Sequence, residues 1–204
     1  MPSRNVRKPD AAESYYHIYA RGNNKQPIFL DVTDYQYFIS LFARYLSAEP
    51  QHDKTGVPYA HYRGSIELLA YCLMPNHFHL FVYQRDQSAM SGFMKSIMTS
   101  YGRYFNLKYK RTGSIYESTY KASLISTDAY LMHISRYIHL NPRRWRRYVF
   151  SSIAYYTGAK PPEWLTPRRV TNLFSSPRAY LQFVCDYEGQ KSILDELKHE
   201  LADI

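Results

Sequence analysis

Apolar and polar positions follow two different periods along most of the chain. Four segments have the composition or alternation typical of β-strands, and they span residues 15–21, 65–74, 77–83 and 120–125. Three segments repeat apolar residues every three or four positions, as helices with one buried face do, and they span residues 31–48, 88–108 and 127–140. The predicted order is therefore strand, helix, strand, strand, helix, strand, helix.

This order is that of the ferredoxin-like βαββαβ plan, in which an antiparallel sheet carries two helices on one face. We therefore predict an α+β fold in which the last helix is an addition that docks on the opposite face of the sheet. Asp31 or Thr33 can cap the first helix, and Thr127 or Asp128 can cap the last one, which should end at Asn141 before a proline.

The pattern changes after residue 141, where a basic cluster is followed by shorter elements. Pro161 and Pro162 mark a possible boundary. Beyond it, three short helices are predicted at residues 166–175, 178–187 and 192–201. We expect a main domain over residues 1–160 and an accessory C-terminal helical region over residues 161–204.

The charge balance is the unusual feature of the composition. The 204 residues include 26 Lys and Arg against 17 Asp and Glu, a formal charge of +9, together with 22 tyrosines. This combination favours a polyanionic partner whose flat bases can stack on tyrosine rings, such as single-stranded nucleic acid. A basic protein with no such partner can have the same composition. Cys72 and Cys185 lie far apart, in no metal-binding or redox spacing, and are expected to be reduced.

No membrane or secretory segment is predicted. Residues 2–9 are basic but lack the apolar run of a signal peptide, and no stretch approaches the roughly 20 apolar residues of a membrane-spanning helix. A soluble protein of the cytoplasm is expected.

The first candidate for chemistry is His77-Phe78-His79. Pro75 and Asn76 fit the central positions of a tight turn, so the two central strands should form a hairpin with the histidines near its closed end. Side chains alternate along a strand, so both imidazoles face the same way while Phe78 faces the core. Such a pair is half of a metal site, or simply two histidines on a solvent-facing strand.

The second candidate lies about sixty residues further along. Tyr137 and Asn141 are four residues apart, hence on one face of the helix that ends there. With two imidazoles, the amide oxygen could hold a divalent cation whose coordination shell is completed by phosphate oxygens. Tyr137 would be the nucleophile. The alternatives are a core tyrosine and an asparagine that only ends a helix.

These residues lie in strings that resemble a known family. The strings are GNN at 22–24, YCLMPNHFHL at 71–80, MTSY at 98–101, RYFN at 103–106 and SRYIHLNP at 135–142. They are similar to motifs of the single-tyrosine HUH transposases, and the closest branch looks like the REP-associated tyrosine transposases. The resemblance covers about residues 15–154.

The resemblance implies a function. It assigns Mg²⁺ or Mn²⁺ binding to His77, His79 and Asn141, and the nucleophile to Tyr137. It implies cleavage and rejoining of single-stranded DNA through a 5′-phosphotyrosine, recognition of hairpin DNA, and a catalytic role for the domain over residues 1–160. Relatives occur as monomers and as homodimers that exchange the helix carrying the tyrosine. The resemblance therefore allows either a monomer or a homodimer for this chain.

Basic residues are the predicted contacts to DNA phosphates. The predicted set is Arg103, Lys108, Lys110, Arg111, Lys121, Arg143, Arg144, Arg146 and Arg147. For those interleaved with tyrosines, the alternative is a solvated helix face with its rings in the core. His139 lies on a different face from Tyr137 and is expected at the surface or facing DNA. Two other functions are considered: a hairpin-binding or regulatory protein without catalysis, and a HUH nuclease of replication or plasmid transfer.

Overall fold

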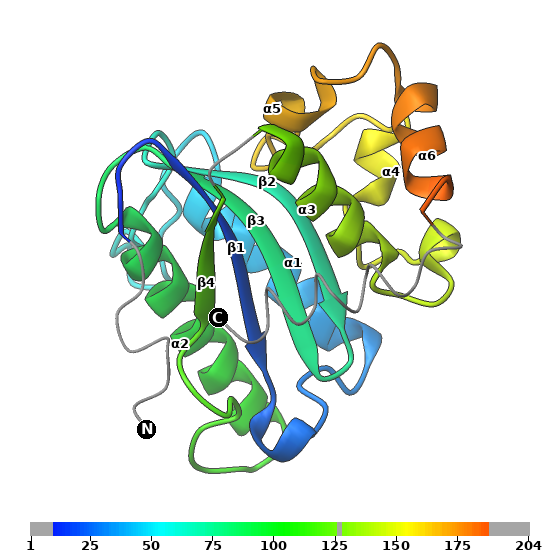
Figure 1. Cartoon of the computed structure of the whole chain (residues 1–204). Helices are drawn as coiled ribbons and strands as arrows, with labels where there is room; N and C mark the ends of the chain where they lie inside the picture. Colours follow the sequence, from blue (N-terminus) through cyan, green and yellow to red (C-terminus); the bar gives the residue numbers. More distant parts are fainter. Residues whose placement is uncertain (1–9, 126–127, 188–204) are drawn as a thin grey trace, which may run out of the picture.

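The computed structural model describes residues 10–125 and 128–187 and consists of one four-stranded sheet with helices on both faces (Figure 1). The strands are β1 (Ser14–Arg21), β2 (Ile66–Met74), β3 (His77–Gln84) and β4 (Lys121–Ile125). They lie in the order β2-β3-β1-β4, and every neighbouring pair is antiparallel. This is the predicted ferredoxin-like plan, and the α+β fold class is confirmed.

The helices divide between the two faces of the sheet (Figure 1). The bounds of the helices are η1 Asn23–Lys25, α1 Val32–Leu46, α2 Ala89–Lys108, α3 Asp128–Leu140, η2 Trp145–Arg147, α4 Ile153–Tyr156, α5 Arg168–Thr171 and α6 Pro177–Cys185, where η1 and η2 are single 3-10 turns. α1 and α2 cover one face, and α3 covers the other together with the short helices that follow it.

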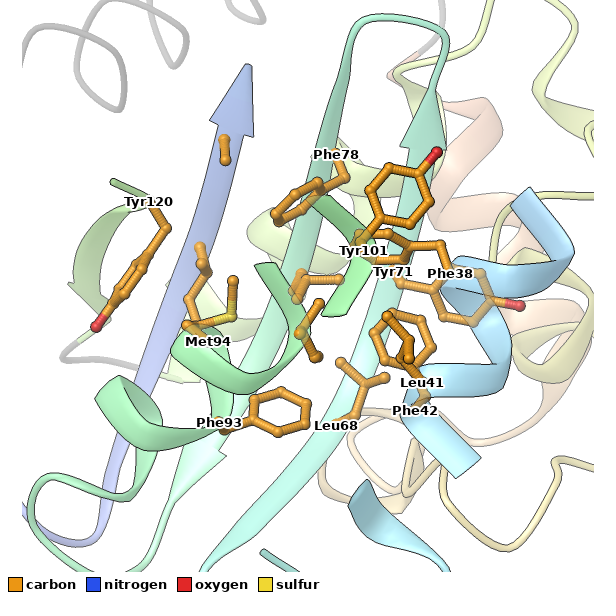
Figure 2. Close-up of a cluster of buried hydrophobic side chains, with 14 of the residues drawn as sticks. Phe38, Leu41, Phe42, Leu68, Tyr71, Phe78, Phe93, Met94, Tyr101 and Tyr120 are labelled. Carbon is orange, nitrogen blue, oxygen red and sulfur yellow. The ribbon is translucent and has the colours of Figure 1, made fainter. Parts of the chain in front are cut away.

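The first core lies between the sheet and the pair α1 and α2 (Figure 2). Alternate residues of β3 contribute to it, namely Phe78, Leu80 and Val82, and all three are completely buried. Phe38 of α1 packs on Phe78 with ring centroids 5.0 Å apart. The residues between them in β3 point to the opposite face, so burial of this core fixes which way the histidines of β3 face.

The second core lies between the sheet and α3, and the C-terminal segment closes it. Ile134 and Ile138 of α3 meet Phe81 of β3, and Tyr180 and Val184 of α6 pack into the same cluster. The backbone of residue 166 also bonds to that of residue 68 in β2, with the nitrogen 2.8 Å from the oxygen. The described residues beyond 160 therefore share a core with the main body, while the division into domains at residue 160 stays a prediction.

The ends of α1 and α2 are joined by a buried charge cluster. Asp31 caps α1, as predicted, and forms a capping box with Asp34. Asp34 is completely buried and accepts from Lys108 Nζ at 2.7 Å and from the hydroxyls of Tyr104 and Tyr109. Lys108 also pairs with Asp31 at 2.8 Å. The cluster ties the start of α1 to the end of α2.

Some sequence predictions differ from the structure or fall outside the described residues. α5 is much shorter than the helix predicted over residues 166–175. The helix predicted at residues 192–201, the basic residues 2–9, Thr127 and the side chain of Asp128 lie outside the part that the structure describes. Within the described part, no helix has the length and apolarity to cross a membrane.

Candidate active site

The β2–β3 hairpin brings His77 and His79 to the face that α3 covers. The predicted turn at residues 75–76 is present, and the chain after β1 holds it: Gly22 N donates to Asn76 O and Ile28 N donates to Pro75 O, both at 2.8 Å. The two imidazole centroids are 5.0 Å apart and their planes are nearly perpendicular, at 88°. His77 is partly exposed at the rim, whereas His79 is only 5% exposed.

The end of α3 places the other two predicted residues against this pair. Asn141 Oδ1 lies 3.3 Å from His77 Nε2, within hydrogen-bond distance. The Tyr137 ring packs edge-on against His79 with centroids 5.4 Å apart. Four residues predicted from two distant motifs are thus brought together in one chain, although the roles assigned to them remain predictions.

A third histidine, His17 of β1, belongs to the same cluster and was missed from the sequence. Its Nε2 lies 2.9 Å from His79 Nδ1. Its side chain is 1% exposed, and burial lowers the pKa of His17 to about 3, so the imidazole is neutral. Its other nitrogen, Nδ1, is buried and has no hydrogen-bond partner among the described residues.

Arg21, at the end of β1, is the positive charge beside the site. It lies directly opposite His77 in the β1–β3 register and is exposed. Burial lowers the pKa of His77, while the hydrogen bond from its Nε2 to Asn141 Oδ1 raises it and the Arg21 charge lowers it further. A cation at this position is also suited to attract a phosphate of a nucleic-acid strand.

The phenol of Tyr137 is protonated in this structure at neutral pH. Burial raises its pKa above the usual value near 10, and the Asn141 hydrogen bond and the Arg21 charge offset only part of that increase. The side chain is 7% exposed. An attacking oxygen here would need both access to its target and stabilisation of the phenolate by a nearby positive charge.

The side chains of His77, His79 and Asn141 suit a divalent cation whose remaining ligands would come from phosphate or water. His77 Nε2 and Asn141 Oδ1 converge on each other, and the buried Asn141 Nδ2 has no hydrogen-bond partner in the described part of the chain. His79 engages His17 through Nδ1, so Nε2 is the nitrogen through which His79 would bind a cation. Among the described residues, no cluster of three or more His, Cys, Asp or Glu side chains suited to a metal is found. The amide of Asn141 is therefore essential to this set, and its three neutral ligands suit a site where phosphate supplies negative charge.

The basic residues predicted to contact DNA have different surroundings. Arg103, Lys110 and Arg111 line an open hollow of about 950 Å³ on the outer side of α1 and α2. Arg143, Arg144, Arg146 and Arg147 line a smaller hollow of about 230 Å³ directly after Asn141. Lys121 lies over the Tyr19 ring, 5.6 Å from its centroid. Lys108 is engaged by Asp31 and Asp34, so its charge is already paired within the chain. DNA contact by these residues stays a prediction.

The expectation for His139 was wrong. It is completely buried, with Nδ1 2.6 Å from the Tyr180 hydroxyl and Nε2 2.8 Å from Ser152 Oγ. Burial lowers its pKa to about 3. His139 therefore joins α3 to α4 and α6 rather than facing solvent or DNA, because the segment after residue 141 folds back over that face of α3.

Comparison with known proteins found one family model and two solved structures to which this chain is similar. Residues 56–141 match the model of the IS200-like transposase family, which confirms the family resemblance predicted from the motifs. A solved REP-associated tyrosine transposase, bound to a REP hairpin, is similar in fold: the TM-score is 0.53 at 14% identity over 74% of this chain and 82% of that one. A candidate transposase from Deinococcus radiodurans R1 also matches, with a TM-score of 0.40 at 14% identity over 68% of this chain and 95% of that one. No curated protein matches the sequence.

Proposed function

We propose that this chain, which resembles the IS200-like transposases, is a metal-dependent transposase that cleaves and rejoins single-stranded DNA through a phosphotyrosine. The observation that carries the proposal is the meeting of the two motifs: His77 and His79 from β3 face Tyr137 and Asn141 from the end of α3. The family match over residues 56–141 includes all four residues.

Each side chain has a role in this proposal. His77, His79 and Asn141 would hold Mg²⁺ or Mn²⁺, which when bound would neutralise the scissile phosphate and polarise it toward attack. Tyr137 Oη would be the nucleophile, and Arg21 would draw a neighbouring phosphate toward the rim of the sheet.

The reaction exchanges one phosphodiester for another. Tyr137 Oη forms a bond to phosphorus as the bond from phosphorus to the 3′ oxygen breaks. The phenolic proton is lost to solvent, and the leaving 3′ oxygen takes up a proton to become a 3′-OH. The 5′ phosphate stays on Tyr137, so the bond energy is conserved and attack by a 3′-OH reverses the step without ATP.

The substrate we propose is a DNA hairpin with a single-stranded flank. The solved transposase of similar fold was bound to a REP hairpin. This chain supplies cations close to Asn141 in the sequence, with Arg143 and Arg144 following it after a single proline. A single strand next to the hairpin would reach Tyr137 at the rim while the stem contacts the basic surface.

The active site we propose is formed within one chain. Tyr137 lies against His79 of the same chain, so exchange of the α3 helix between two copies is not needed to assemble the residues. A monomer is therefore expected to be competent. Mixing a Tyr137→Phe chain with a His77→Ala chain tests this, because recovery of activity in the mixture would indicate a homodimer that shares its sites.

The test is covalent capture of DNA. The protein is incubated with labelled hairpin DNA carrying single-stranded flanks and Mn²⁺, and the products are separated under denaturing conditions. A protein–DNA adduct is expected for the wild type and should disappear with chelator and in Tyr137→Phe. Tyr130→Phe is the matched control, because Tyr130 lies on the same helix but is 45% exposed and away from the cluster, and its adduct should persist.

Two results of the capture experiment would contradict the proposal. If the wild type binds hairpins tightly and forms no adduct with any flank tested, the chain is a hairpin-binding or regulatory protein on a transposase fold. An adduct that survives Tyr137→Phe would place the nucleophile on another residue.

A further inference from the structure

We propose that His17 is a positioning residue of this site: it sets the tautomer and the plane of His79, and it supports the ring of Tyr137. The inference rests on the proposed function, since it concerns how the site is prepared for a cation and for attack by a tyrosine. His17 lies outside every motif that led to the site, and it is supplied by a different strand.

The hydrogen bond between the two histidines lies in the plane of both rings. The ring planes differ by only 12°, their centroids are 5.1 Å apart, and His17 Nε2 is 2.9 Å from His79 Nδ1. Two imidazoles side by side at this distance must share one proton between the facing nitrogens. The register of the sheet explains the contact, because Tyr19 pairs with His79 and His17 is the next residue of β1 on that face.

The position of the shared proton decides whether His79 can bind a cation. If His17 donates, His79 carries its own proton on Nε2 and that nitrogen has no free lone pair. If His79 donates through Nδ1, its Nε2 presents the lone pair that a metal requires, and the proton of His17 moves to Nδ1. His17 Nδ1 is buried and has no hydrogen-bond partner among the described residues in either state, so no protein acceptor there selects one tautomer, and a cation bound at His79 Nε2 would select the second.

The same pair also forms the surface on which Tyr137 rests. The Tyr137 ring stands perpendicular to both imidazoles, at 85° to His17 and 84° to His79, with centroids 5.6 and 5.4 Å away. Because the distances and angles are nearly equal, the ring lies across the join between the two histidines. Loss of His17 would remove half of this support together with the hydrogen bond at His79 Nδ1.

Two substitutions separate the hydrogen bond from the ring. His17→Phe keeps a flat ring under Tyr137 but removes the nitrogen that accepts from His79. His17→Gln loses the ring but restores an acceptor, because its amide oxygen reaches about as far from the backbone as imidazole Nε2. The matched control is the same pair of changes at His61, which has one hydrogen bond to the Ser47 carbonyl and lies away from the site. Thermal unfolding of each variant establishes that it is folded.

The readout is binding of Mn²⁺ measured by calorimetry in the absence of DNA. We expect His17→Phe to lose about 10- to 100-fold in affinity, His17→Gln to recover most of that loss, and both His61 variants to match the wild type. In nitrogen NMR of the Mg²⁺-saturated wild type, both His79 and His17 should carry their proton on Nδ1.

These measurements distinguish failure of the proposed role of His17 from failure of the proposed metal site. Wild-type affinity in folded His17→Phe, or an unprotonated His79 Nδ1 in the Mg²⁺-bound protein, would overturn the role of His17 and leave the metal site standing. Equal losses in His17→Phe and His17→Gln would show that the hydrogen bond is not what matters, which also overturns it. If the wild type binds no Mn²⁺, the proposed metal site fails and this inference fails with it.

Discussion

Replacing Arg143 and Arg144 together with alanine should weaken hairpin binding in a way that depends on salt. Both side chains are exposed, they follow Asn141 after a single proline, and they line one hollow with the next two arginines. They are therefore placed to bind phosphates next to the scissile bond. Neither side chain packs in a core, so the substitution should leave the fold intact.

The size of the effect follows from counterion release. Each phosphate neutralised on duplex DNA contributes about 0.9 to the slope of log affinity against log salt, so losing two contacts should flatten the slope by about 1.8. Over a fourfold rise in salt, from about 50 to 200 mM, the wild type should lose about 12-fold more affinity than the double variant. At low salt the variant should bind more weakly for every sequence, because phosphate contacts carry no base information.

Fluorescence anisotropy with a labelled hairpin, titrated at several salt concentrations, measures this slope. The control is a double alanine variant at Lys54 and Lys160, which removes the same charge from exposed positions outside this hollow. The control should retain the wild-type slope. An unchanged slope in the Arg143 and Arg144 variant, or an equal change in the control, would refute phosphate contact by this cluster.

Four further predictions concern stability and the metal. Asp34→Asn should lower the free energy of unfolding by about 2 kcal/mol, measured by denaturant titration, because it removes the buried charge that accepts from the partly exposed Lys108. Burial raises the pKa of Asp34, but its donors lower it more, so its stabilisation should hold near neutral pH and be lost on acidification, which unfolding at a series of pH values would reveal. Since burial lowers the pKa of His77, Mn²⁺ affinity measured from about pH 5 to 8 should persist below pH 6.5, where a free imidazole would be protonated. Asn141→Ala should weaken Mn²⁺ binding by calorimetry while hairpin affinity without metal is unchanged.

The local pattern of the sequence was enough to predict the sheet and its three main helices, whereas the joining of the two motifs in one site was expected from the resemblance to the HUH transposases. Strand alternation fixes His77 and His79 on one face, because Phe78 between them is buried in the first core. Helical spacing does the same for Tyr137 and Asn141. The ferredoxin-like plan does not say where an added helix ends, so only the structure shows that the end of α3 lies against the start of β3.

His17 and Arg21 were missed because their importance depends on register between strands. Both lie on the face of β1 that points away from the first core, and the spacing of residues 17, 19 and 21 was a visible signal. Which residues of β3 they meet follows only from the pairing of Arg21 with His77. His139 was misjudged for a similar reason, because its burial comes from Tyr180, 41 residues later in the chain.

The hydrogen bonds of the site also determine when it can form during synthesis. His17 contacts a residue 62 positions later, and His77 contacts one 64 positions later, so the site closes two successive long loops. The N-terminal part of a nascent chain is made first, so His17 has its partner once residue 79 is added, whereas His77 lacks Asn141 until residue 141 is added. A product truncated within α3 before Tyr137 contains all three histidines and lacks both Tyr137 and Asn141, so we expect it to form no DNA adduct.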